Sequence, residues 1–292
     1  MSGLTRGTFC KACAGAVAGM AWGTPRVAWP FFAFDIEVHD ERKRTLAEQA
    51  QLLKELGYDG AGHLWLDQAA ERLATLEDCG LRLFQIYVKL NITPGHEKPY
   101  DPKLKEVLPK LKGRNVMLAV LSEGGKPSDE SGDPRAVELL REIADMAAPY
   151  GVRVALYHHV RAWLERFEDN LRVAKKVDRA NVGAMFNLCH WSKVGDEAAL
   201  PGVLRSGLPQ LMAVSINGMD KVADIQAGKG NWIQPLGSGS FDMYGFLKML
   251  GGVGYRGPIG LQCWGIKGDA RVHLTQSIGA WKELCTRLNA ES

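Results

Sequence analysis

Several features that would point to a particular class of partner are weak or missing in this chain of 292 residues. The formal net charge is only +3, too small to indicate a surface for nucleic acid or an anionic membrane. After the N-terminal segment, no apolar run is long enough to form a membrane-spanning helix. No linker rich in Pro, Gly or Ser divides the chain. We therefore expect neither nucleic acid nor a membrane as a partner, and one large core.

The cysteines do not form a zinc-binding pattern. They are spread along the chain as Cys10, Cys13, Cys79, Cys189, Cys263 and Cys285. The first two form a C-x-x-C pair, but no second pair accompanies them to complete a zinc site. Cys189 and Cys263 both lie near predicted strand ends, so they are candidates for close approach. A disulfide bond between them is an open alternative, because the sequence does not determine it.

The N-terminal segment has the composition of an export signal. Residues 1–23 combine the basic Arg6 and Lys11 with a short run of small and apolar residues that ends in a small-x-small pattern. The segment resembles a twin-arginine signal, although Gly7 stands where a second arginine is expected. We predict that this signal directs the protein to the periplasm or outside the cell. The alternative is a cytoplasmic protein with a loosely packed N-terminus.

From residue 29 onward, short apolar strands alternate with amphipathic helices. The predicted strands cover 31–38, 58–65, 81–90, 116–121, 152–157, 211–216 and 258–263, and one further strand opens the segment 181–191. The predicted helices cover 45–56, 66–79, a segment that ends near 112, 134–149, 161–177, 241–250 and 270–288. In the first helix, Thr45 and Glu48 form a capping box, and Gly57 ends the helix.

This alternation predicts an α/β fold. Strands that alternate with helices are typical of parallel βαβ units, and eight such units close naturally into a (β/α)8 TIM barrel of about 250 residues. An open doubly wound sheet is the alternative, but no glycine-rich phosphate fingerprint follows any strand. We therefore predict a single TIM-barrel domain over residues 29–292.

Polar side chains gather where the predicted strands end, which is the face of a barrel that carries function. Asn187 and His190 are three residues apart at the clearest of these transitions. We expect substrate to contact His63, Lys89, Tyr157, Asn187, Ser215, Asn217, Gln262 and Trp264. Amides, histidines and aromatic rings suit a hydroxylated small molecule such as a sugar.

Some of these residues also have a structural interpretation. Asn187 is suited to cap a turn, and His190 to be a hydrogen-bonded histidine of the core. His39 is more simply explained as a solvent-exposed side chain. His158 and His159 are adjacent, so within a strand only one of them can face the mouth of the barrel.

Four short motifs, taken in their order and spacing, resemble those of the xylose-isomerase-like barrel superfamily of sugar isomerases and epimerases. They are Gly57-Tyr-Asp-Gly60, Ala155-Leu-Tyr-His-His159, Asn187-Leu-Cys-His190 and Gly260-Leu-Gln262. The resemblance covers essentially the whole chain after the N-terminal segment, and it implies a barrel that acts on a carbohydrate. A DNA-repair endonuclease of this superfamily is set aside, because the sequence lacks its dense cluster of histidines and acids.

The resemblance also implies a divalent metal held by a glutamate, an aspartate, a histidine and a second glutamate. The matching positions in this sequence are Tyr157, Asn187, Ser215 and Gln262. None of these carries a carboxylate, and hard divalent cations favour anionic oxygen ligands. We therefore assign no metal ligand, and the one cofactor left open is a weakly bound divalent ion such as Mn, Mg or Zn.

Two functions are open at this point. The one that we favour is a sugar isomerase or epimerase that moves a proton next to a carbonyl group in a rebuilt, metal-poor site. Its candidates for proton transfer are Glu123, His159 and His190. The alternative is an exported, non-catalytic carbohydrate-binding barrel. A small carbohydrate is the expected partner in both, and assembly into a homo-oligomer is left open.

Overall fold

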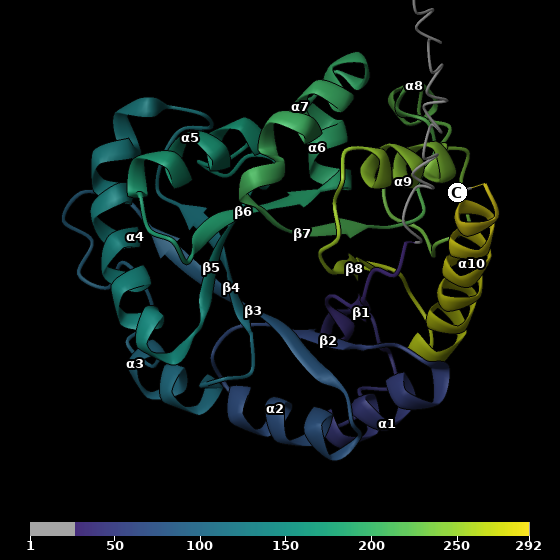
Figure 1. Ribbon diagram of the computed structural model, residues 1–292, viewed down its shortest axis with the longest axis horizontal. Helices are drawn as coiled ribbons and strands as arrows, with labels where there is room; N and C mark the ends of the chain where they lie inside the picture. The colour runs from purple at the N-terminus through teal and green to yellow at the C-terminus, as the bar shows by residue number, and fades with distance from the viewer. Residues whose placement is uncertain (1–26, 292) are drawn as a thin grey trace, which may run out of the picture.

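The strands form a closed parallel barrel, as their alternation with helices predicts. The computed structural model describes residues 27–291, so the predicted export signal at 1–23 lies outside the described residues. The strands pair in chain order, and the last pairs with the first (Figure 1). They are β1 (Phe31–Ala33), β2 (Gly60–His63), β3 (Arg82–Asn91), β4 (Met117–Glu123), β5 (Arg153–Tyr157), β6 (Val182–Asn187), β7 (Leu211–Ile216) and β8 (Ile259–Leu261).

Helices surround the barrel and cover its outer side (Figure 1). They are α1 (Leu46–Leu56), α2 (Ala69–Asp78), α3 (Leu104–Val107), α4 (Asp133–Ala147), α5 (Phe167–Val177), α6 (Leu188–Val194), α7 (Leu200–Gly207), α8 (Val222–Gln226), α9 (Met243–Gly252) and α10 (Ala270–Ala290). Within residues 27–291, no helix has both the length and the apolar character that crossing a membrane requires.

The structure differs from the sequence prediction in a few short elements. The predicted strand at 31–38 is extended only over β1, and the 3-10 helix η1 (Ile36–Val38) follows it. The sequence also does not predict α6, α7 or α8. These helices have seven, eight and five residues, and a helical repeat is hard to recognise in so few turns.

Two layers of apolar side chains hold the barrel together. The outer layer fills the space between strands and helices, and it includes Phe31, Leu118 and Trp281. The inner layer lies inside the barrel, and it includes Phe32 and Met117. Phe31 and Phe32 are neighbours that belong to different layers, because successive side chains of a strand point to opposite faces. A polar side chain at the end of a strand that lies on the same face as the inner layer therefore points into the mouth of the barrel.

The turn between α1 and β2 contains the first of the four motifs. Gly57 ends α1 in the left-handed conformation, with φ 86°. The Asp59 carboxylate accepts a hydrogen bond from the backbone N–H of Phe31 at 2.7 Å, which ties the turn to β1. Gly60 has φ 155°, and a Cβ atom there would lie 1.9 Å from the carbonyl oxygen of Arg82. A side chain at residue 60 would therefore force β2 away from the start of β3.

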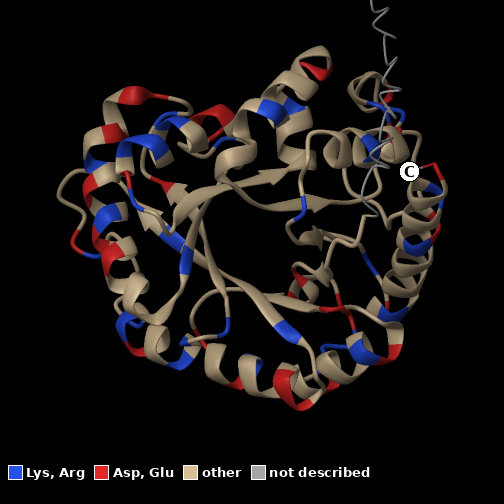
Figure 2. Cartoon of the chain, in the orientation of Figure 1, with Lys and Arg blue, Asp and Glu red and all other residues tan. Residues whose placement is uncertain are grey.

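Charged residues lie mainly on the outer helices, where both signs are interspersed (Figure 2). The strands carry four charged side chains, Arg82, Lys89, Glu123 and Arg153. The two arginines are the first residues of β3 and β5, at the end of the barrel opposite the mouth. The strands therefore contribute one cation and one anion, Lys89 and Glu123, to the side where they end.

Candidate functional site

Three neutral polar side chains contact the amide of a fourth, Asn187, at the ends of neighbouring strands. Asn187 Nδ2 lies 2.8 Å from Tyr157 Oη, 2.7 Å from Ser215 Oγ and 2.9 Å from Gln262 Oε1. Each side chain is buried, and they come from β5, β6, β7 and the residue after β8. We call these four residues the amide cluster. Segments up to 75 residues away from Asn187 thus converge on its amide group.

A second contact fixes the orientation of the Asn187 amide. Its Oδ1 accepts a hydrogen bond from the backbone N–H of His190 at 2.8 Å, which makes Asn187 the N-cap of α6. Rotation of the amide would place its NH2 group against that N–H, so the nitrogen must face the other three groups. The predictions of Asn187 as a cap and as a mouth residue are therefore compatible, because opposite ends of one amide perform the two tasks.

Two histidine rings lie against the amide cluster. The ring centroids of His159 and His190 are 3.8 Å apart, and His190 meets Tyr157 edge-on at 5.9 Å. His159 Nδ1 is 2.8 Å from the carbonyl oxygen of Val160, so Nδ1 carries the hydrogen and Nε2 the lone pair. Burial lowers the pKa of both imidazoles. Both rings are therefore neutral at pH 7 and able to accept a proton.

His190 is not the fully hydrogen-bonded core histidine that its structural interpretation requires. Its side chain is 5% exposed, yet Nδ1 has no hydrogen-bond partner among the described residues. A buried polar atom of this kind is normally paired. The free nitrogen of His190 is therefore a candidate contact for a bound molecule.

The side chains of His158 and His159, the two residues after β5, have different surroundings, as their adjacency predicts. His158 is fully buried and packs against Phe167 and Phe186. Its Nε2 accepts a hydrogen bond from the backbone N–H of Asn187 at 2.9 Å, and burial lowers its pKa to about 3. His158 therefore supports the backbone of β6 from outside the mouth.

A charged pair lies at the ends of β3 and β4. Lys89 Nζ is 2.9 Å from Glu123 Oε1, and it also lies 5.0 Å from the ring centroid of Trp65. Both charged side chains are about half exposed. Two residues before Lys89 on the same strand, Tyr87 packs edge-on against Tyr157 at 5.3 Å. The aromatic contact between Tyr87 and Tyr157 connects this rim to the amide cluster.

Three other residues predicted to bind substrate have different surroundings. Both ring nitrogens of His63 are used within the protein, 2.7 Å from Glu37 Oε1 and 2.6 Å from a backbone carbonyl oxygen. Asn217 is fully buried and donates to two backbone carbonyl groups. Trp264 is 55% exposed. The structure thus brings together the amide cluster and the His159–His190 pair, with His63 and Asn217 held by their own local contacts.

The prediction that His39 is exposed is wrong. The side chain is 2% exposed, and its Nδ1 lies 2.7 Å from His273 Nε2. His273 is 234 residues away, so no local pattern around residue 39 indicates this contact. The disulfide alternative is also not realised, because Cys189 and Cys263 are buried free thiols.

Two tryptophans have contacts with lysine side chains that the sequence did not predict. Trp65 lies beside Lys89, and the Trp232 ring centroid is 5.2 Å from Lys193 Nζ. Both tryptophans lie outside helices and strands, and Trp65 is 38% exposed. An aromatic residue in a loop on the functional side of a barrel is a usable signal, because loops there commonly carry binding residues.

Comparison with known proteins agrees with this geometry. The family model described as xylose isomerase-like TIM barrel matches residues 50–285. A stretch of 62 residues is 34% identical to inosose isomerase from Bacillus subtilis (strain 168), and covers 20% of this chain and 22% of that protein. The match with this relative therefore spans only about a fifth of either chain.

Solved structures of two sugar epimerases have the same fold. An L-ribulose 3-epimerase superposes with a TM-score of 0.68 at 14% identity, over 89% of this chain and 95% of that one. A 3-keto-D-glucoside 4-epimerase from E. coli superposes with a TM-score of 0.67 at 17% identity, over 89% of this chain and 100% of that one. The family model covers most of the chain, so this protein belongs to the xylose isomerase-like TIM barrel family.

Proposed function

We propose that this protein binds a small carbohydrate in the mouth of the barrel and moves a proton on the carbon next to its carbonyl group without a bound metal. The observation that carries the proposal is the pair of neutral imidazoles, His159 and His190, beside the amide cluster. Family membership supports a sugar as the substrate class. The contacts of His159 and His190 support proton transfer.

The residues at the family's metal positions do not fit a divalent cation. The two N–H groups of the Asn187 amide are shared among the oxygens of Tyr157, Ser215 and Gln262, and the amide oxygen caps α6. A cation among these groups would meet N–H hydrogens and no carboxylate. The amide cluster therefore supports a site that recognises hydroxyl groups by hydrogen bonding.

At neutral pH both histidines are uncharged, because burial lowers the pKa of each imidazole, so both keep a lone pair that can accept a proton. His159 Nε2 carries the lone pair because Nδ1 donates to Val160, and His190 Nδ1 has no protein partner. A neutral imidazole can take a proton from the carbon next to a carbonyl and leave an enediolate. In isomerisation the imidazolium returns the proton to the neighbouring carbon while another proton passes between the two oxygens; in epimerisation a second donor protonates the same carbon from the opposite face. Tyr157 stays protonated, since burial raises its pKa, so it can donate to a sugar oxygen.

The experiment measures exchange of substrate hydrogen with solvent. The protein is freed of metal with a chelator and incubated in deuterated buffer with a panel of ketoses and keto-sugars, and NMR follows deuterium at the carbon next to the carbonyl. We expect exchange in the presence of chelator, and a loss of about 100-fold or more in His159→Gln and His190→Gln, the lower range for a general acid–base group. His96→Gln, at an exposed histidine, is the matched control.

Two outcomes would contradict the proposal. Exchange that appears only after a divalent metal is added would show that the mouth needs a cation. Exchange that survives both histidine substitutions would show that other groups move the proton.

The amide cluster favours one second function, an exported and non-catalytic carbohydrate-binding barrel. Its four groups are neutral and buried, and hydrogen bonding to hydroxyl groups requires no proton transfer. In this case calorimetry would detect sugar binding, while no sugar of the panel would exchange its hydrogen. The same protein samples therefore separate the two functions.

A further inference from the structure

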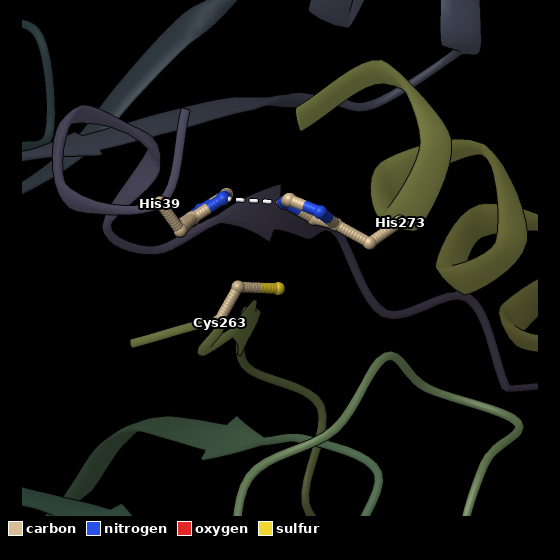
Figure 3. A group of neighbouring side chains, drawn as sticks. All are labelled: His39, Cys263 and His273. Atoms are coloured by element: carbon tan, nitrogen blue, oxygen red, sulfur yellow. Dashed lines mark hydrogen bonds between the residues drawn. The ribbon is translucent and has the colours of Figure 1, made fainter. Parts of the chain in front are cut away.

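Three buried side chains with metal-binding atoms meet where the barrel closes (Figure 3). His39 follows η1, Cys263 lies two residues after β8, and His273 is in the first turn of α10. His39 Nδ1 is 2.7 Å from His273 Nε2, and one ring nitrogen of each histidine and Cys263 Sγ all lie within 4.8 Å of one another. We call these three residues the seam cluster, because β1 and β8 pair beside it.

The seam cluster is separate from the mouth of the barrel. Gln262 belongs to the amide cluster, and its neighbour Cys263 belongs to the outer apolar layer between the strands and the helices. Neighbouring residues of an extended segment point to opposite sides. No hydrogen bond joins the two clusters among the described residues, so a ligand of the seam cluster would occupy a different site from the proposed carbohydrate.

Polar atoms beside the seam cluster are incompletely paired. His39 Nε2 is buried without a hydrogen-bond partner, and it lies 3.6 Å from Asp35 Oδ1. The same Oδ1 accepts the backbone N–H of Cys263 at 2.9 Å, while Asp35 Oδ2 is buried and unpaired. A carboxylate near the outer nitrogen of a histidine is the arrangement that orients metal-bound histidines. These atoms therefore point to an ion on the other side of the His39 ring.

We propose that the seam cluster binds one Zn²⁺ ion through His39 Nδ1, His273 Nε2 and Cys263 Sγ. Imidazole nitrogen and thiolate sulfur are the ligands that zinc prefers, and water can hold the fourth position. Tetrahedral zinc with ordinary bond lengths places two nitrogens about 3.3 Å apart and a nitrogen and a sulfur about 3.6 Å apart. The two rings therefore separate by about 0.6 Å from their present 2.7 Å when the ion replaces the hydrogen between them.

The charges of the surrounding groups suit a divalent ion. Burial raises the pKa of Asp35 to about 7, so binding releases protons from both the Cys263 thiol and the Asp35 carboxyl group, and the thiolate and carboxylate together offset the two positive charges of zinc. A buried group of ions without net charge avoids the large cost of an isolated buried charge. Asp35 is 1% exposed, and its carboxyl group accepts a hydrogen bond from the backbone N–H of Cys263.

The ion would join three segments that are far apart in the sequence. His39 and His273 are separated by 234 residues, and together with Cys263 they connect the end of β1, the end of β8 and α10. An ion that binds only the folded chain stabilises it in proportion to its affinity and concentration. Zinc at this position would therefore hold the barrel closed.

The experiment uses Co²⁺ as a spectroscopic probe of a thiolate ligand. The full chain is stripped of metal with a chelator and titrated with Co²⁺ and, separately, with Zn²⁺. We expect a sulfur-to-cobalt charge-transfer absorption with one equivalent of Co²⁺, its loss when one equivalent of Zn²⁺ is added, and a rise in the melting temperature with Zn²⁺. Cys263→Ser should abolish the absorption. Cys189→Ser, at an equally buried cysteine, should retain it.

Two further variants keep the test valid if Cys263→Ser does not fold. His273→Gln should weaken Zn²⁺ binding, and Asp35→Asn should weaken it by about 10-fold to 100-fold, as for other partners of metal-bound histidines. A folded wild-type chain that gives no absorption and no thermal shift would overturn the proposal. So would an absorption that persists in Cys263→Ser, or a site that takes copper ions but not zinc.

Discussion

At the scale of single residues, Asn187 shows how one amide can serve both the structure and the site. Its oxygen caps α6 through the backbone N–H of His190, and its nitrogen contacts Tyr157, Ser215 and Gln262. The backbone N–H of the same residue donates to His158. The sequence identified Asn187 and His190 from their spacing at a strand end, but it could not show that both interpretations of Asn187 apply together.

Carboxylates placed in the amide cluster should create the metal site that the present residues do not fit. We predict that the double variant Asn187→Asp with Gln262→Glu binds Mn²⁺ at least about tenfold more tightly than the wild type, because anionic oxygens replace amides. Isothermal titration calorimetry measures the affinity. Gln51→Glu with Gln276→Glu adds the same charge at exposed positions and should leave the affinity unchanged. An equal gain in both double variants would contradict the prediction.

His158 should make the folded chain sensitive to acid. Burial lowers its pKa to about 3, while an unfolded chain has a histidine pKa near 6.5, so the unfolded state takes up the proton first as pH falls. Stability from this residue is present above about pH 6.5 and is lost below it, by about 2 kcal/mol between pH 7 and pH 5. Urea unfolding at the two pH values measures it.

The matched variant for this prediction is His158→Gln, whose amide oxygen can accept the N–H of Asn187 without titrating. The loss of unfolding free energy between pH 7 and pH 5 should be smaller in this variant by the stated amount. His96→Gln, at an exposed histidine, should lose as much as the wild type. Equal losses in all three proteins would contradict the assignment.

At the scale of elements, the sequence predicted the strands better than the connections between them. The bounds of β7 agree with the prediction, and most other strands differ by one or two residues. Short helices such as α6 were not predicted because their few residues show no clear helical repeat. The first strand was predicted too long because apolar residues continue beyond it into η1. These residues form a 3-10 helix and not part of the sheet.

The close approach of β2 and β3 gives a prediction at this scale. Gly60→Ala should cost about 3 kcal/mol or more, because the new Cβ would lie 1.9 Å from the carbonyl oxygen of Arg82. Gly80→Ala is the control, since it also has a positive φ but meets no atom within 4 Å. Its cost should be about 1–2 kcal/mol, from backbone strain alone. Urea unfolding of both variants decides, and equal costs would contradict this account of the turn.

At the scale of the whole molecule, the chain carries two groups of polar side chains on opposite sides of one strand end. The amide cluster and the His159–His190 pair face the mouth, and the seam cluster faces α10. The sequence predicted the barrel, and it placed Tyr157, Asn187, Ser215 and Gln262 at strand ends, because strand number and side-chain alternation are local patterns. It could not predict the seam cluster, because His39 and His273 meet only when the last helix packs against the first strand.

The measurement that tests this account most directly is an anomalous difference map from crystals grown with Zn²⁺ and, separately, with Mn²⁺. We expect a zinc peak between His39, Cys263 and His273, and no peak for either metal among Tyr157, Asn187, Ser215 and Gln262. A metal peak in the amide cluster would contradict the central claim that the mouth of this barrel works without a cation.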